Sequence, residues 1–246
     1  MKHIVAIISI VCIALIILYK ISLHLFRDKI SSIIEYDKIH IDNFLKIVET
    51  GDIIQITNRF NPRFLQYTLL GLINGTFYLH SAIVVKDRNG IPYLVHMQQI
   101  NNKQYKRHTD NFNNNSGGIY IERLDDLLRL YTKRYGSIFA WYRVNDKDKH
   151  RFKALNIINA AMSIKNIKYI STSELLYIMW RRAINLRSNL PKKSAQCNIV
   201  IGYILESLGV FQKCEDIYLD YTPDNFDILL DKSGAFEVMR QLKITF

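Results

Sequence analysis

Cys197 is the residue of this sequence whose surroundings best suit nucleophilic chemistry. It follows Ser194, a residue type that often caps a helix, and it precedes the apolar stretch 198–208, which ends at Gly209. We therefore expect Cys197 in the first turn of a helix. There, backbone N–H groups without helical partners and the helix dipole favour a thiolate, and the same N–H groups can receive an oxyanion.

A cysteine nucleophile needs a base, usually histidine, and a third polar group that orients the imidazole. His80 begins the apolar run 80–85, and His96 lies near the end of the run 92–97. Asn89-Gly90 between the runs is a strong hairpin signal. The two histidines are therefore expected side by side on neighbouring antiparallel strands, with His80 as the candidate base.

Two other interpretations use the same residues. Two histidines and one cysteine also carry the donor atoms of a catalytic zinc site formed by His80, His96 and Cys197. A strand histidine and a cysteine at a helix start are also common as packed residues, which would leave a binding module without turnover. Such a module could use the basic residues before the cysteine to bind anionic headgroups, namely Arg181, Arg182, Arg187, Lys192 and Lys193. No aromatic residues of the RNA-binding pattern are interleaved with them, so no specific nucleic-acid partner is expected.

The order of the motifs resembles a known family. The chain is similar to the circularly permuted NlpC-type papain-like cysteine hydrolases, a group that includes YiiX-like proteins, homologues in large DNA viruses and the lecithin:retinol acyltransferase branch. The resemblance rests on segments spread over most of the chain, which are Gly51-Asp52-Ile53-Ile54-Gln55, His80 to Val85, Tyr93 to Met97, Gln196 to Val200, Leu208-Gly209-Val210 and Tyr221 to Phe226.

The resemblance implies a papain-like fold in which Cys197 is the nucleophile, His80 the general base and acid, and His96 the orienting residue. Histidine rather than glutamate at that third place is similar to the acyltransferase branch. Gln196 stands where an aromatic residue is frequent and Asn198 where serine is common, and both differences are expected to tune specificity.

The implied reaction is acyl transfer without a cofactor. The Cys197 thiolate would attack the carbonyl of a peptide, another amide or a lipid ester, and the resulting thioester would pass to water or to another acceptor. Tyr78 and Tyr169 could contact the substrate, although packing in the core is the simpler expectation for both.

The elements that must position these residues are mixed in order. Short apolar runs predict strands at 53–56, 80–85, 92–97, 119–122 and 138–144. Helical spacing predicts helices at 64–72, 124–135, 146–163, 175–184 and 198–208, and polar stretches predict a loop at 101–118 and a linker at 185–193. Such an order favours an α+β fold with an antiparallel sheet.

The N-terminus predicts a membrane anchor at residues 1–29. Residues 4–19 are uncharged and almost wholly apolar, and extension to Phe26 gives 23 residues, enough for a tilted span. A cleaved signal peptide is the alternative, but no small-x-small cleavage site follows, and a core helix fits less well. Basic residues on the domain side, Lys20, Arg27 and Lys29, favour a cytoplasmic domain. Residues 30–48 then form a helical connector, and residues 49–246 form the hydrolase domain.

Composition agrees with one tethered domain. The chain of 246 residues has a net charge of +11, and residues 30–246 keep 29 basic and 21 acidic residues, a net charge of +8. This balance suits a bilayer surface as a partner. Cys12, Cys197 and Cys214 show no metal-type spacing. A disulfide between Cys197 and Cys214 is one possibility, and free thiols in a reduced, intracellular domain are the simpler expectation. The abundance of Ile, Asn and Lys is typical of an AT-rich genome, and the sequons at Asn74 and Asn114 would matter only in a lumen.

Overall fold

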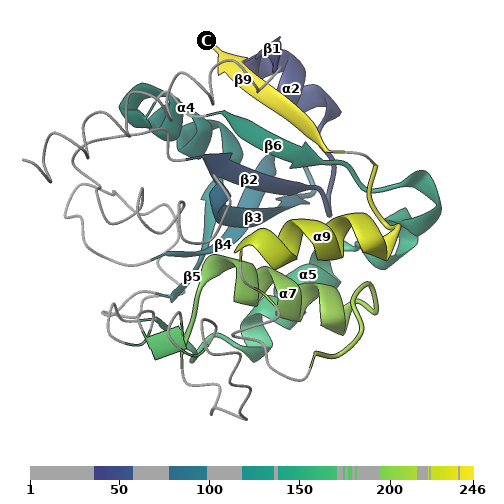
Figure 1. The fold of residues 1–246 in the computed structure, drawn as a ribbon. Helices are drawn as coiled ribbons and strands as arrows, with labels where there is room; N and C mark the ends of the chain where they lie inside the picture. The colour runs from purple at the N-terminus through teal and green to yellow at the C-terminus, as the bar shows by residue number, and fades with distance from the viewer. Residues whose placement is uncertain are drawn as a thin grey trace, which may run out of the picture.

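The computed structural model describes residues 36–57, 78–98, 118–135, 138–170, 194–214, 223–237 and 239–246, together with positions 174, 177, 178, 181 and 221. In these parts the chain forms a mixed sheet with helices on both faces (Figure 1). The expected α+β class is therefore confirmed. The predicted anchor, the helix at 64–72, the sequons and nearly all of the loop at 101–118 lie outside the described residues.

Within the described ranges, the main sheet has seven strands in the order β1-β9-β6-β2-β3-β4-β5. The strands are β1 (Asp37–His40), β2 (Ile53–Thr57), β3 (Tyr78–Lys86), β4 (Pro92–Gln98), β5 (Gly118–Arg123), β6 (Phe139–Tyr142) and β9 (Arg240–Thr245). Neighbours pair antiparallel except β1 and β9, which are parallel. All five predicted strands are present, whereas β1 and β9 were not predicted.

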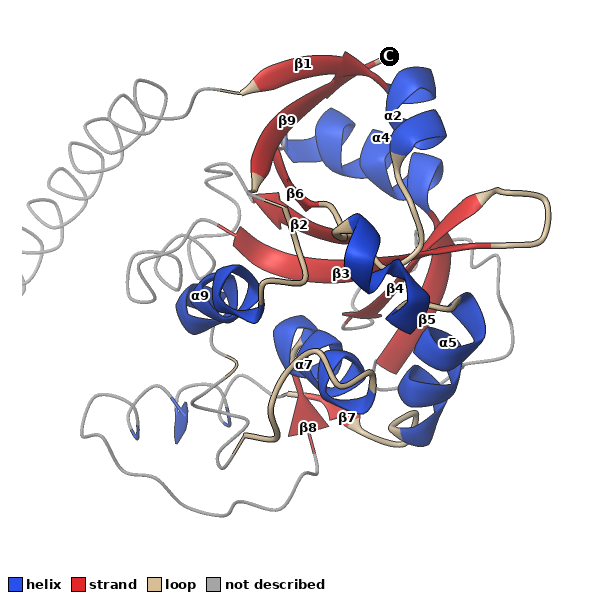
Figure 2. Cartoon of the chain, turned by 90° about the vertical axis from the view of Figure 1, so that its right-hand side faces the viewer, coloured by secondary structure: helices blue, strands red, loops and turns tan. Residues whose placement is uncertain are grey.

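The helices cover both faces of this sheet. On one face lie α2 (Ile41–Ile47) and α4 (Leu124–Tyr135), and on the other lie α5 (Ala154–Ser163), α7 (Cys197–Ser207) and α9 (Pro223–Ser233) (Figures 1 and 2). Alternate residues of the strands divide between the two cores: Ile54 and Ala82 pack toward α2 and α4, while Ile53 and Ile83 pack toward α5, α7 and α9. Apolar runs without polar alternation therefore become strands that are buried on both faces.

The predicted helical connector is partly wrong. Residues Asp37–His40 form β1, which pairs with β9 near the C-terminus, and α2 buries Ile41 and Phe44 in the core. This stretch therefore belongs to the folded domain. None of the helices in the described ranges is long and apolar enough to span a bilayer.

The predicted helix 146–163 is divided. A 3-10 helix, η3, covers Asp146–Arg151, and α5 begins at Ala154. Phe152 between them is buried against Gly51, where an added Cβ would lie 2.5 Å from the Phe152 ring. Gly51 also has φ +99°, so glycine is required there for two reasons.

The glycine of the Gly51-Asp52 motif is followed by a buried carboxylate that joins three segments. Asp52 accepts hydrogen bonds from the Glu49 amide (2.9 Å), the Trp141 indole N–H (2.8 Å) and the Val144 amide (3.0 Å). Burial raises the pKa of Asp52 in spite of these donors. The motif therefore fixes the start of β2 against β6 and the residues that follow it.

Gly202 allows α7 to approach Tyr221 closely. A Cβ at this position would lie 2.6 Å from the Tyr221 ring, so the ring or the helix would have to shift. We expect Gly202→Ala to lower the free energy of unfolding by about 1–2 kcal/mol, because overpacking exceeds the helix propensity gained. Urea denaturation measures the change. Ser207→Ala, on the exposed side of the same helix, is the control and should be nearly neutral; an unchanged Gly202→Ala variant would contradict the close contact.

Candidate active site

The two predicted histidines lie together on the β3–β4 hairpin. His96 pairs with Ala82, and the Nε2 atom of His80 lies 2.9 Å from the Nδ1 atom of His96. The ring planes meet nearly edge to face, with centroids 5.0 Å apart. The two histidines are therefore side by side, as the Asn-Gly turn predicted, and the register of the β3–β4 hairpin places them there.

Glu122 on β5 extends this pair. Its Oε2 atom lies 3.0 Å from the Nε2 atom of His96, whose other ring nitrogen faces His80. The apolar run 119–122 predicted the strand, but no local pattern pointed to the contact of Glu122 with His96. Tyr120 pairs with His96, and Glu122 lies two residues further along β5, so its side chain is on the same face of the sheet. Only knowledge of the β4–β5 pairing would have indicated this.

The chain of contacts fixes the tautomers when both rings are neutral. A carboxylate only accepts hydrogen bonds, so His96 donates from Nε2 to Glu122 and presents an unprotonated Nδ1. His80 must then donate from Nε2 to that Nδ1 atom. This leaves the lone pair of the other nitrogen, Nδ1 of His80, available as a base.

The surroundings of His80 favour the neutral ring. Its side chain is almost completely enclosed, and Tyr131 of α4 stacks on it with ring centroids 6.0 Å apart. Burial, followed by the nearby His96, lowers the pKa of His80 well below its ordinary value of 6.5. The imidazole is therefore unprotonated at neutral pH, although burial makes it a weaker base.

The lowered pKa of His80 predicts acid sensitivity. In the unfolded chain this histidine binds a proton as the pH falls through about 6.5, whereas in the folded chain it stays neutral. The folded state therefore loses stability relative to the unfolded state as the pH falls below this value. One such group changes the free energy of unfolding by up to about 1.4 kcal/mol per pH unit. Urea denaturation at several pH values should show a shallower loss for His80→Gln than for the wild type. Equal slopes would contradict the prediction.

Cys197 is the first residue of α7, as the sequence analysis required, but the cap differs from the prediction. The N-cap is Gln196, which makes no side-chain capping bond. Ser194, the predicted cap, lies instead in the short strand β8 (Ser194–Ala195), which pairs with β7 (Lys168–Tyr169). The chain enters α7 from this two-stranded ladder, which fixes the helix start without a side-chain cap.

The sulfur of Cys197 lies against β3. The backbone amides of Ser81, Asn198 and Cys197 itself lie near the sulfur and favour its charged form. Ser81 directly follows His80, so the thiol contacts the peptide next to the candidate base. The β3–β4 ladder runs from Lys86–Pro92 only as far as Ala82–His96, and the sulfur contacts β3 just beyond this end.

The thiol and the imidazole belong to different layers. α7 packs on β3 and β4 from the side of α5 and α9, whereas His80 stacks on Tyr131 from α4. Consecutive strand residues point to opposite faces of the sheet, so the side chains of His80 and Ser81 face different layers.

The thiol is not a preformed thiolate, contrary to the expectation from its place at a helix start. Cys197 is only 4% exposed, and burial raises its pKa more than the three amides lower it. Because the pKa of His80 is lowered at the same time, the resting pair is a neutral thiol and a neutral imidazole. Among the described residues, no hydrogen bond joins the Cys197 sulfur to the His80 ring.

The zinc alternative does not fit this geometry. The facing nitrogens of His80 and His96 bond to one another, so they cannot both point at one ion. No group of three or more His, Cys, Asp or Glu side chains in the described ranges is arranged to hold a metal.

The remaining predicted residues have other surroundings. Tyr169 lies in β7 and packs against the core around α7, as the simpler expectation held. Arg181 is fully buried, so it does not present its charge to a bilayer surface. The side chain of Tyr78 and the other basic residues of that segment lie outside the part of the chain that is described.

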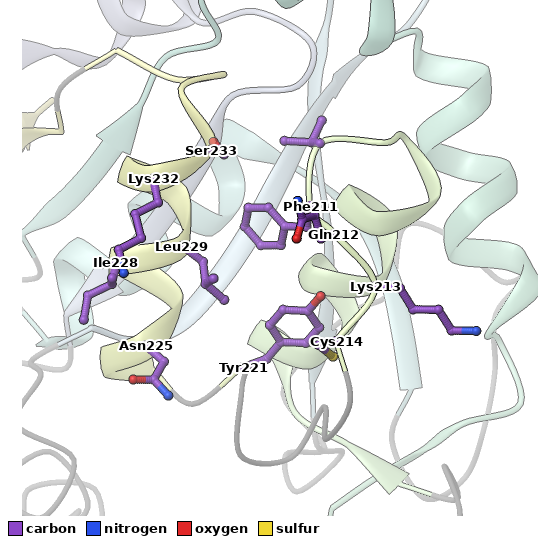
Figure 3. A pocket seen from close by; sticks show the side chains of 11 residues that line it. Phe211, Gln212, Lys213, Cys214, Tyr221, Asn225, Ile228, Leu229, Lys232 and Ser233 are labelled. Carbon is purple, nitrogen blue, oxygen red and sulfur yellow. The ribbon is translucent and has the colours of Figure 1, made fainter.

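A cavity of about 640 Å³ lies at the opposite end of α7, between the following loop and α9 (Figure 3). Phe211, Leu229 and Tyr221 form its wall, and Cys214 lines it. The Tyr221 hydroxyl donates to Glu206 at 2.6 Å. No predicted site residue lines this cavity, but it gives Cys214 an exposure that Cys197 lacks.

Neither a known family model nor a curated protein matches this chain.

Proposed function

We propose that this protein is a cysteine hydrolase or acyltransferase that acts on an amide or ester through a thioester at Cys197, and that its domain has the permuted NlpC-type papain-like fold. The observation that carries the proposal is the chain of contacts from Glu122 through His96 to His80. His80 directly precedes Ser81, whose backbone amide lies near the Cys197 sulfur. A helix that opens with a cysteine and packs on a histidine-bearing hairpin supports the fold.

In the proposed mechanism, one bridging water connects the thiol and the imidazole, which belong to different layers at rest. The proton of the Cys197 thiol passes through this water to Nδ1 of His80 while the sulfur attacks the carbonyl carbon. The amides at the start of α7 stabilise the oxyanion. His80 then gives its proton to the leaving amine or alcohol, which leaves a thioester. Water or another acceptor, deprotonated by His80, attacks this thioester and restores the thiol.

The predicted anchor and the net charge of +8 over residues 30–246 favour substrates near an anionic membrane. Lipid esters and peptide or lipidated amides are the classes that fit, because both present a carbonyl next to the bilayer. A cytoplasmic domain on a single N-terminal span remains the expected arrangement.

A binding module of the same fold without turnover is the second candidate. The burial of Cys197 favours it, since a thiol that is 4% exposed must become accessible before it can react. The same experiment separates the two candidates.

The test is to locate an acyl adduct. The full chain is incubated with p-nitrophenyl esters of short and long acyl chains and quenched in acid, and the acylated peptides are identified by mass spectrometry. The hydrolase is expected to carry the acyl group on Cys197, and His80→Gln should slow its formation. Cys214, the more exposed thiol, is the internal control. Acylation of Cys214 alone, or a Cys197 adduct that forms independently of His80, would overturn the proposal in favour of the binding module.

A further inference from the structure

Asn198, the second residue of α7, carries a buried side-chain group without a use in the resting fold. The residue is 1% exposed, and its Nδ2 atom has no hydrogen-bond partner among the described residues. A buried NH2 group that lacks a partner is costly, and native structures contain few of them. This group therefore requires an explanation.

The other end of the same carboxamide contacts the candidate nucleophile. The Sγ atom of Cys197 lies 3.6 Å from Oδ1 of Asn198, so the resting thiol can donate its hydrogen to that oxygen. The thiolate has no hydrogen to donate and instead needs N–H groups. Rotation by about 180° about χ2, which is a broad two-fold torsion in asparagine, brings Nδ2 to the position of Oδ1.

We propose that the Asn198 carboxamide is the side-chain partner of the Cys197 sulfur in both protonation states: its oxygen accepts from the resting thiol, and its NH2 group turns to donate to the thiolate. This inference deepens the proposed function and rests on Cys197 as the nucleophile. It makes Asn198 a positioning and charge-stabilising residue, and it explains why an amide follows the cysteine directly.

The proton balance shows why such a partner is useful. When Cys197 gives its proton to Nδ1 of His80, two neutral groups become a thiolate and an imidazolium. The new negative charge forms on a buried sulfur, where burial disfavours it. Backbone amides near this sulfur favour its charged form, and the NH2 group belongs to the carboxamide whose oxygen already contacts the sulfur. This NH2 group has no hydrogen-bond partner among the described residues.

On the described elements that pack around α7, the charged groups do not supply this role. The first turn of α7 has no acidic or basic residue that could respond, and α5 contains no titratable side chain. β3 and β4 contribute His80 and His96, and α9 contributes Asp227, which accepts from Gln55 at 2.6 Å. Gln55 lies directly opposite Ser81, so this carboxylate is held by another polar side chain.

The experiment titrates each thiol of the full chain in wild type, Asn198→Asp and Asn198→Ser. Rates of iodoacetamide labelling are followed over pH by mass spectrometry, peptide by peptide. Aspartate keeps the shape and an acceptor oxygen but adds negative charge. Serine carries a hydroxyl that both donates and accepts. The serine variant keeps the inference testable if the aspartate variant does not fold. Asn156→Asp, an exposed site on α5, is the matched control for charge.

The expected result is an apparent pKa of Cys197 that is higher by about one unit or more in Asn198→Asp, and by less in Asn198→Ser. The labelling rate of Cys197 at neutral pH should fall roughly tenfold, while the titration of Cys214 stays unchanged. A Cys197 titration that is the same in all variants would overturn the inference and leave Asn198 a packing residue. Absence of any acyl adduct in the wild type would instead overturn the proposed function, and the titration would still decide the role of Asn198.

Discussion

Cys197→Ala is expected to abolish turnover of any ester or amide that the protein hydrolyses, with a loss of about 10⁴-fold or more in kcat. The thioester cannot form without the sulfur. The other cysteine of the described ranges, Cys214, lines the separate cavity beyond the other end of α7. Release of p-nitrophenol from the most reactive ester of the panel measures the loss.

Cys214→Ala is the matched control for this experiment, because it removes a thiol that is more accessible and lies outside the candidate site. It should retain wild-type turnover. Both variants should show the same unfolding transition as the wild type within about 1 kcal/mol, apart from small packing losses. Residual turnover in Cys197→Ala that equals the wild type would exclude Cys197 as the nucleophile.

Glu122→Gln is expected to lower kcat about a hundredfold with little change in KM. A glutamine can present its NH2 group to Nε2 of His96, which a carboxylate cannot do. His96 would then carry its proton on Nδ1 and donate to His80, whose remaining proton would lie on the nitrogen that must act as the base. The catalytic loss arises because the whole chain of tautomers is reversed.

Asp126→Asn controls for the change of charge, because it removes one carboxylate at an exposed position of α4. It should leave kcat unchanged. Nitrogen-15 NMR of the two imidazoles reports the tautomers directly and should show the protonated nitrogen of His80 change in Glu122→Gln. If kcat and the tautomers stay as in the wild type, Glu122 only packs against His96.

The neutral resting pair changes how reactivity should be measured. A thiolate at a helix start would label rapidly at neutral pH, but burial raises the pKa of Cys197 and lowers that of His80. Labelling in the absence of substrate therefore underestimates a nucleophile that is activated only during attack. Acylation by an activated ester is the more direct measurement.

Local signals in the sequence determined much of the site. The Asn-Gly turn and the apolar runs on either side predicted the hairpin, and the hairpin alone placed His80 beside His96. The apolar stretch that ends at Gly209 predicted the helix that opens with Cys197. These features depend on the period of strands and helices and on turn chemistry, which are properties of a few consecutive residues.

Tertiary structure decided the rest. β1 pairs with β9 across almost the whole described chain, and no local pattern indicates that Asp37 lies opposite Leu242. The contact of Glu122 with His96 depends on β5 adding to the edge of β4 after a long intervening segment. The sequence by itself determined which residues could do chemistry and the helix start of Cys197. Only the packed layers decided that its sulfur is a neutral thiol, because desolvation is set by what covers a residue and not by its neighbours in the chain.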